Sequence, residues 1–376
     1  MKTTILLLII FLPAFYSCNS QNASQLTNGN SSGKNSSIAI GDTVGGLSDS
    51  IMIIFQDKKN IYWFGSRGQG VFRYDGKVMQ HYTMKQGLVN NDIWGIQEDK
   101  SGNIYFDTQE GVSKFDGQTF STLMVSNFSN NDWAAAGPDD LWFKGNWNKN
   151  GAYRYDGKYF HQHSFPKNKI AEDVRGNSPN MTWSPYGIYS IYEDRKGNAW
   201  FGTSNVGLYR CHVPPGNSST SGSSLSWMYE DQLTNVPGGG SFGIRSIFED
   251  KDGKFWFCNT HYRYTIELED SITNDQRFIR YKREKGIDNF KSTEGKDHIY
   301  FLSITEDDKH DLWMVTYNEG VWHYDWKNMT QYVIHEGDKT ITLFSIYKDN
   351  NGVLWLGTHA NGAYKFNGTS FERFKP

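Results

Sequence analysis

The sequence predicts an all-β protein, a seven-bladed β-propeller of four-stranded antiparallel blades. A similar line recurs along the chain, as "IYEDRKGNAWFGT" (residues 191–203), "IFEDKDGKFWFCNT" (247–260) and "IYKDNNGVLWLGT" (346–358). Counting the weaker copies aligned below, there are seven, spaced 37 to 58 residues apart, which is the spacing of propeller blades. No segment shows the sustained apolar stripe of an amphipathic helix, and aromatic residues, which favour strands, make up 16% of the chain.

The N-terminal segment predicts export and anchoring. Lys2 precedes an apolar run from Ile5 to Phe15, and "FYSC" then ends at Cys18. This layout predicts a lipoprotein-type signal peptide over residues 1–18, because "FYSC" resembles a lipobox with Cys18 as the lipidated residue. An ordinary cleaved signal is the alternative. Residues 19–37 are almost devoid of apolar side chains and predict a flexible tether, with the propeller over residues 38–376. We therefore expect a lipid-anchored protein of the bacterial cell envelope, facing the periplasm or the cell surface.

The repeat is aligned best on one aromatic residue in each copy. These residues are Trp63, Tyr105, Trp142, Trp200, Trp256, Trp313 and Trp355. Six positions earlier stands Asp in every copy except the third, which has Ala136, and three positions earlier stands Gly, Asn, Asp or His. Those residue types tolerate the left-handed backbone region, and Asp accepts local backbone hydrogen bonds. The spacing therefore predicts one tight turn between the first two strands of each blade.

The first strand of each copy is apolar on both faces, which is typical of a strand covered on both sides. Ten positions before the aromatic residue stands a small residue in most copies, as in Ser190 or Gly95, which suits the crowded axis of a propeller. No strand exchanged between the chain ends is evident, so we expect the segment from Ile38 to Leu47 to close the ring.

At this point the sequence resembles the two-component regulator propeller family. The resemblance is carried by "GLVNNDIWGIQEDKSGNIYFDTQEGVSKFD" (Gly87–Asp116), with clear copies in blades one, four and seven. The family's large members form the periplasmic sensors of membrane histidine kinases and are often tied to polysaccharide use. This chain holds a single propeller and no kinase or DNA-binding module, so the resemblance implies the recognition role alone.

The loops between the second and third strands differ among the copies and are expected to meet at one mouth of the ring. Their side chains combine aromatic rings, amides and charges, which suit a sugar or a peptide. The ligand-binding candidates are Arg67, Gln109, Glu110, Trp147, Asn148, Asn205, His261, Tyr262, Arg263, Tyr317, Glu319, His359 and Asn361. Alternatively, these loops are polar only because they meet water.

Blade five departs most from the loop pattern. "THYRY" (residues 260–264) stands where other copies place Gly, and we expect it to contribute most to recognition. The alternative is an irregular connection into the long insertion that follows.

Charge and cysteine usage exclude several classes of function. With 38 Lys and Arg against 41 Asp and Glu, the net charge of −3 gives no basis for nucleic-acid binding. No basic cluster predicts membrane contact, so the lipid anchor is the only expected membrane attachment. His161 and His163 lack a third metal ligand, and Cys211 and Cys258 fall in different blades, so we expect no metal, cofactor or disulfide. A monomer is expected.

Two classes of function compete. The first is a recognition module, not an enzyme, that binds a glycan, a peptide or a partner protein. The alternative is a lyase or hydrolase acting in the mouth of the ring, because "GPDDLWF" (Gly137–Phe143) resembles the repeat of the seven-bladed streptogramin lyases. No catalytic residue is evident, so the sequence favours binding.

Overall fold

The chain divides into a first unit, residues 1–36, and a second unit, residues 37–376. The structure, a computed structural model, describes residues 39–126, 131–146, 149–177, 180–213, 225–230, 235–236, 240–241, 243–274 and 276–376. The expected signal peptide with Cys18, the tether and the candidates Trp147 and Asn148 lie outside these ranges. Within them, no helix is long and apolar enough to cross a membrane.

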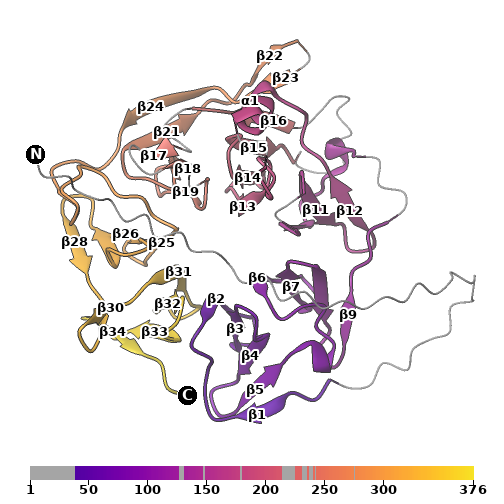
Figure 1. Ribbon diagram of the computed structural model, residues 1–376, viewed down its shortest axis with the longest axis vertical. Coiled ribbons are helices and arrows are strands. Elements are labelled where there is room, and N and C mark those ends of the chain that lie inside the picture. The colour runs from indigo at the N-terminus through magenta and orange to yellow at the C-terminus, as the bar shows by residue number, and fades with distance from the viewer. Residues whose placement is uncertain are drawn as a thin grey trace, which may run out of the picture. The chain divides into compact units, whose positions relative to one another are not determined.

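The second unit is an all-β propeller, as the sequence predicts, with its blades arranged in a ring (Figure 1). Six blades have four antiparallel strands, numbered here from the innermost outward. Blade 1 has β2 (Ile51–Gln56), β3 (Tyr62–Ser66), β4 (Val71–Tyr74) and β5 (Met79–Tyr82). Blade 2 has β6 (Ile93–Glu98), β7 (Ile104–Thr108), β8 (Gly111–Phe115) and β9 (Phe120–Thr122). Blade 4 has β13 (Ile188–Glu193), β14 (Ala199–Thr203), β15 (Leu208–Cys211) and β16 (Leu225–Met228).

The other three four-stranded blades follow the same order. Blade 5 has β19 (Ile247–Glu249), β20 (Phe255–Phe257), β21 (Tyr262–Ile266) and β24 (Tyr281–Lys285). Blade 6 has β25 (Ser303–Glu306), β26 (Leu312–Val315), β27 (Val321–Tyr324) and β28 (Met329–Tyr332). Blade 7 has β31 (Leu343–Lys348), β32 (Leu354–Thr358), β33 (Ala363–Phe366) and β34 (Phe371–Arg373).

Blade 3 differs from the others because its described residues include no innermost strand. It consists of β10 (Leu141–Phe143), β11 (Ala152–Tyr155) and β12 (Phe160–His163). A short 3-10 helix, η2 (Trp133–Ala135), precedes these strands. Trp133 stacks on Trp142, with ring centroids 5.7 Å apart. An aromatic pair therefore covers the blade where an inner strand would have packed, and the expected fourth strand of blade 3 is absent from the described residues.

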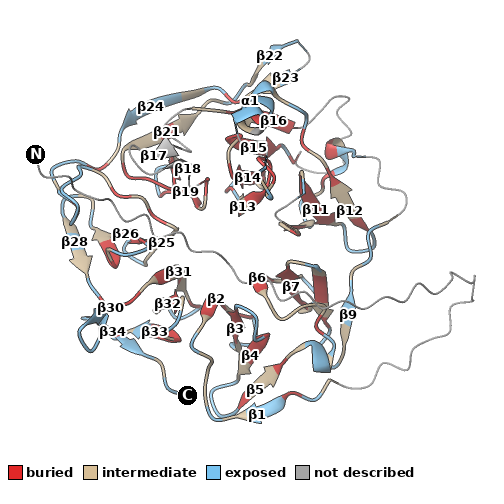
Figure 2. Ribbon diagram, viewed as in Figure 1, coloured by how far each residue is buried: buried red, intermediate tan, exposed pale blue. Residues whose placement is uncertain are grey.

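The hydrophobic core consists of seven clusters, one for each pair of neighbouring blades. Each cluster contains the repeated aromatic residue of one blade and side chains of the next blade: Trp63 packs on blade 2, and Trp355 packs on blade 1. Figure 2 shows that buried residues concentrate on the strands within the ring, whereas outer strands such as β24 are largely exposed. The repeated aromatic residue is thus the wedge that joins each blade to its neighbour.

The turn between the first two strands has the predicted backbone. The residue three positions before the repeated aromatic residue has positive φ in six blades, at Asn60, Gly102, Gly197, Gly253, His310 and Gly352. The aspartate of the turn binds the side chain of the repeated aromatic residue as well as the turn backbone. In blade 1, Asp57 Oδ1 accepts the backbone N–H groups of Lys59 and Ile61, while Oδ2 accepts the indole N–H of Trp63 at 2.9 Å.

The same carboxylate-to-ring bond occurs in all blades except blade 3. The donors are Trp63, Tyr105, Trp200, Trp256, Trp313 and Trp355. One carboxylate therefore fixes both the turn and the repeated aromatic residue. Blade 3, where Ala136 replaces the aspartate, is the one whose described residues include no inner strand.

The ring closes by packing between blades 7 and 1. Ile51 of β2 pairs with Thr358 of β32, and Tyr62 Oη donates to Asp349 at 2.7 Å. In the segment expected to close the ring, β1 (Asp42–Val44) pairs with β5 as a fifth strand on the outer edge of blade 1, and Val44 and Leu47 pack against the cluster between blades 7 and 1. Closure needs no added strand, since Trp355 wedges blade 7 against blade 1 as in every other pair.

Two insertions fasten neighbouring blades. The hairpin β22 (Ser271–Thr273) and β23 (Gln276–Phe278) leaves blade 5 and adds β23 to β16 of blade 4. Helix α1 (Lys169–Asn177) precedes blade 4, and its Ala171 is buried in the cluster between blades 3 and 4. Short pairs also form between β17 (Asn235–Val236) and β18 (Gly240–Ser241), and between β29 (His335–Glu336) and β30 (Lys339–Thr340).

Candidate functional site

A cavity of about 1000 Å³ lies where the blades converge. All seven blades contribute lining residues, for example Arg67 from blade 1, Lys144 from blade 3 and His359 from blade 7. The segment that joins blades 5 and 6 adds Lys296 and His298. Ligand sites usually have volumes of 300–1,000 Å³ with a few polar groups among apolar walls, so this cavity has the size of a binding site.

The apolar wall of the cavity comes from a repeated β-bulge. At the start of the first strand the pairing register skips one residue in blades 1, 2, 4 and 7. The skipped residues are Met52, Trp94, Tyr189 and Phe344, and all four line the cavity. A bulge re-aims one side chain out of the alternating pattern of a strand. The fold therefore presents three rings and a thioether at this end of the ring.

Charged groups stand at the rim and on the floor of the cavity. Arg67 Nη1 lies 3.3 Å from His359 Nε2, which joins blades 1 and 7 across the rim. The Tyr317 ring meets the His359 ring edge-on at 6.5 Å, and Tyr317 is half exposed. Glu319 accepts a hydrogen bond from Thr293 Oγ1 at 2.6 Å. These contacts hold the rim residues in place while leaving the Tyr317 ring accessible.

Lys144 lines the part of the cavity that we call its floor, and Asp107 contacts Lys144 where the described residues of blade 3 include no inner strand. The Asp107 carboxylate accepts the backbone N–H groups of Lys144, at 2.7 Å, and of Gly145. Burial raises the pKa of Asp107 to about 6, and these bonds oppose the rise. Burial also lowers the pKa of Lys144, and nearby Arg245 lowers it further. Asp107 thus ties blade 2 to blade 3 in place of strand pairing.

The structure brings five of the sequence-predicted candidates together on this cavity: Arg67, Gln109, Tyr317, Glu319 and His359. Asn361 lines a smaller adjoining cavity of about 450 Å³, which shares Tyr317 and His359. Glu110, Asn205, His261, Tyr262 and Arg263 are not among the lining residues of either cavity. The first group comes from the loops that follow the second strands of blades 1, 2, 6 and 7, which the repeat alignment could identify.

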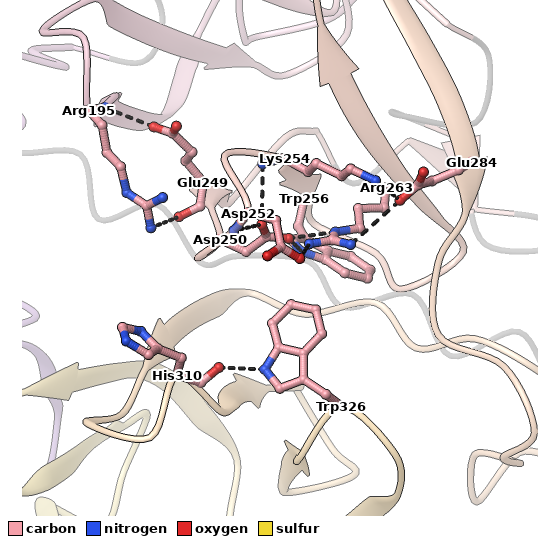
Figure 3. Close-up of polar contacts among 10 residues, drawn as sticks. All are labelled: Arg195, Glu249, Asp250, Asp252, Lys254, Trp256, Arg263, Glu284, His310 and Trp326. Carbon is pink, nitrogen blue, oxygen red and sulfur yellow. Dashed lines mark hydrogen bonds and ion pairs between the residues drawn. The ribbon is translucent and has the colours of Figure 1, made fainter.

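Arg263 belongs to the framework. It lies across from Trp256 on the paired strand, and its guanidinium contacts Asp250 and Asp252, both at 2.6 Å (Figure 3). Other blades place a basic residue at the same register position. Those residues are Arg73, Lys114, Arg154, Arg210, His323 and Lys365. The repeated cation was missed because strand register, unlike turn spacing, cannot be read directly from the sequence.

The remaining part of "THYRY" is tied to the insertion that follows blade 5. Thr260 N–H donates to Ile299 O, and Ile299 N–H donates to Thr260 Oγ1 at 3.0 Å. Gly286 approaches so closely that a Cβ there would lie 2.1 Å from Thr260 O. Blade 5 therefore has no tight hairpin turn with Gly at this place, and its loop is held instead by the segment from Gly286 to Phe301. This agrees with the alternative reading of "THYRY" as an irregular connection into the insertion.

The same insertion gathers three potential metal ligands. His261, Asp297 and His298 each offer one ligand atom, and these atoms lie within 4.8 Å of one another. Sequence reasoning missed this group because the two histidines are far apart in the chain. By contrast, His163 accepts a hydrogen bond from Arg154 Nε at 3.2 Å and His161 pairs with Asp156, so the two strand histidines face different partners.

Cys211 and Cys258 are both buried in separate blades. Cys211 Sγ lies 3.5 Å from Trp133 O, and Cys258 Sγ lies 3.8 Å from Gly243 O. The two thiols therefore contact different parts of the ring, as expected from their places in the repeat, and no disulfide joins them among the described residues.

Comparison with known families confirms the resemblance seen in the sequence. The family model described as two component regulator propeller matches residues 182–205 and 336–360, which cover the repeat lines of blades 4 and 7. A search of curated proteins finds no significant match to the sequence.

Solved structures share the fold. The extracellular domain of the hybrid two-component system BT4673 from B. thetaiotaomicron has 20% identity and a TM-score of 0.55, over 89% of this chain and 40% of that one. The corresponding domain of BT3049 from the same organism has 16% identity and a TM-score of 0.55, over 88% and 41%. Virginiamycin B lyase from Staphylococcus aureus has 14% identity and a TM-score of 0.57, over 86% and 97%. The chain therefore spans about two fifths of the extracellular domains, and these likenesses concern the fold.

Proposed function

Because the chain carries the repeat of the two component regulator propeller family in an all-β propeller, we propose that it is a recognition module of the cell envelope. Its ligand is a glycan or a peptide bound in the central cavity. The observation that carries this proposal is the bulge, which recurs in four blades and delivers Met52, Trp94, Tyr189 and Phe344 to one cavity. Flat rings stack on sugar faces and on peptide side chains.

The polar rim supports the same function. Gln109, Tyr317 and His359 supply amide, hydroxyl and imidazole groups above the apolar wall, and Arg67 supplies a planar fork of donors. The volume of about 1000 Å³ suits a short oligosaccharide or a peptide segment better than the flat face of a partner protein.

An enzyme of the lyase or hydrolase type is the second candidate, and the likeness to virginiamycin B lyase in fold favours it. Asp107, which contacts the cavity-lining residue Lys144, has a raised pKa, but its oxygens accept backbone N–H groups of blade 3. A general base must reach the substrate proton. Asp107 is engaged as a structural acceptor, so we favour binding over catalysis.

A glycan array probed with the full chain tests the proposal, with a random peptide library as the second arm. We expect saturable binding to one ligand class, and replacing Trp94→Ala lowers the affinity at least about tenfold, since aromatic residues dominate such sites. V78A, at an exposed position outside the cavity, is the matched control and binds like the wild type. No binding in either arm, or full binding by W94A, contradicts the proposal.

We propose further that a lipid on Cys18 holds the protein at the membrane. The polar stretch over residues 19–37 then acts as the tether. One acyl chain anchors only marginally, so more than one is required. C18A is expected to move the protein to the soluble fraction after cell fractionation. A wild-type protein that is already soluble contradicts the anchor but leaves the binding proposal intact.

A further inference from the structure

We infer that His261, Asp297 and His298 form a binding site for a divalent transition-metal ion at the edge of the central cavity. The three ligand atoms lie within 4.8 Å of one another. Two imidazoles and one carboxylate suit Zn²⁺ or Co²⁺ rather than Mg²⁺ or Ca²⁺, which prefer oxygen ligands alone. This inference does not depend on the identity of the ligand in the cavity.

The backbone holds the two histidines together. Thr260 and Ile299, their immediate neighbours, are joined by the bonds from Thr260 N to Ile299 O and from Ile299 N to Thr260 Oγ1. Gly286 N–H donates to His261 O at 2.9 Å, which fixes the other side of the loop. The His261 and His298 ring centroids are consequently 5.1 Å apart before any ion is present. A site built in this way loses little chain entropy when an ion binds.

The side chains are available for an ion. Within the described part of the chain, neither ring nitrogen of His261 has a hydrogen-bond partner, although the residue is half-buried. The Asp297 carboxylate is bonded to His298 Nδ1 at 2.9 Å, and its side chain is 70% exposed.

A second group of potential metal ligands lies equally close together, but its side chains are already engaged in the framework of a blade. Asp307, Asp311 and His323 also cluster, in the turn and paired strand of blade 6. There Asp307 accepts the Trp313 indole N–H and the backbone N–H of Lys309, and His323 stacks on Trp313 at 4.1 Å. Those atoms serve the framework found in the other blades, whereas His261 lies between β20 and β21, and Asp297 and His298 lie in the segment that joins blades 5 and 6.

The proposed metal site borders the central cavity. His298 lines the central cavity. Three protein ligands leave at least one coordination position for water or for an oxygen of a bound molecule. The ion is therefore placed where it can contact what the cavity holds.

Titration of the full chain without a histidine tag tests the inference, with Co²⁺ followed by visible absorption and Zn²⁺ by calorimetry. We expect one ion per chain. H261A and H298A each weaken binding at least about tenfold, since even residues behind metal ligands alter affinity by 10–100-fold. D297N, at an exposed side chain, does the same without endangering the fold. H335A, an exposed histidine outside the group, binds like the wild type.

Absence of binding to the wild type overturns the inference. So does binding that survives H261A, H298A and D297N, or that is lost in H323Q instead. Circular dichroism of each variant establishes that it is folded before its affinity is compared.

Discussion

The two ends of the blades use the same repeat in opposite ways. At the turn end, six blades use an aspartate in the same way, to bind the turn backbone and the side chain of the repeated aromatic residue. At the cavity end, the residues that follow the second strand and begin the first differ from blade to blade. The residues of the turn end are thus alike among the blades because they hold the fold together, whereas the residues of the cavity end differ, as a site that distinguishes ligands requires.

The largest expected effect lies at the turn end. Asp250 is fully buried and accepts the Trp256 indole N–H, two backbone N–H groups and Arg263. D250A leaves Arg263 without this buried partner, so we expect a loss of about 3–5 kcal/mol in the free energy of unfolding, measured by chemical denaturation.

The matched control is D252A in the same turn, because the Asp252 side chain is 51% exposed. It is expected to change stability by less than about 1 kcal/mol. Equal losses in D250A and D252A contradict a special role for the buried carboxylate.

The second prediction concerns pH at the floor of the cavity. The pKa of Asp107 is raised from 3.8 to about 6 in the folded protein, so its contribution to stability is present below pH 3.8 and lost as pH rises through 6. From pH 4 to pH 7, the stability of the wild type should therefore fall relative to D107N, by about 2–3 kcal/mol. Parallel stability curves for the two proteins contradict the raised pKa.

Arg263 tests the difference between the two ends directly. The sequence predicted a ligand-binding role for it, whereas the structure pairs it with the turn residues Asp250 and Asp252. R263A removes charge-assisted bonds to Asp250 and Asp252, so we expect a loss of about 2 kcal/mol in stability with ligand binding unchanged. R280A, which breaks a surface pair with Glu267, is the control and should cost less than about 1 kcal/mol. Unchanged stability of R263A together with lost binding restores the recognition hypothesis.

The smallest expected effect on stability is at the cavity wall. Trp94 is only partly buried and lies at a bulge, outside the regular pairing of β6. W94A is therefore expected to change the free energy of unfolding by less than about 1 kcal/mol, by the same denaturation measurement. A loss as large as that of D250A contradicts the separation of the two ends.

The turn between the first two strands could be predicted from the sequence because the residues that form it are close together in the chain. Asp57 and Asn60 lie within six residues of Trp63, so spacing alone indicates a turn with positive φ. The indole bond lies within the same six residues, but only coordinates show that the second oxygen of Asp57 reaches the ring.

The cavity end was harder to predict because its signals are not local. Trp94 and Tyr189 each stand just before the small residue of the first strand, Gly95 or Ser190, and this position could have identified the wall. A bulge cannot be deduced from the alternation of a strand whose two faces are both apolar. The pairing of His261 with His298 depends on an insertion whose path only the backbone bonds reveal.

The most direct test of the account measures binding and stability together on W94A and D250A. One glycan-array experiment with each purified variant, paired with its denaturation curve, gives both quantities. The account predicts a double separation: W94A stays stable and loses the array signal, whereas D250A loses stability and keeps the signal per folded molecule. If W94A binds normally while folded D250A does not, the recognition site is at the turn end and the account is wrong.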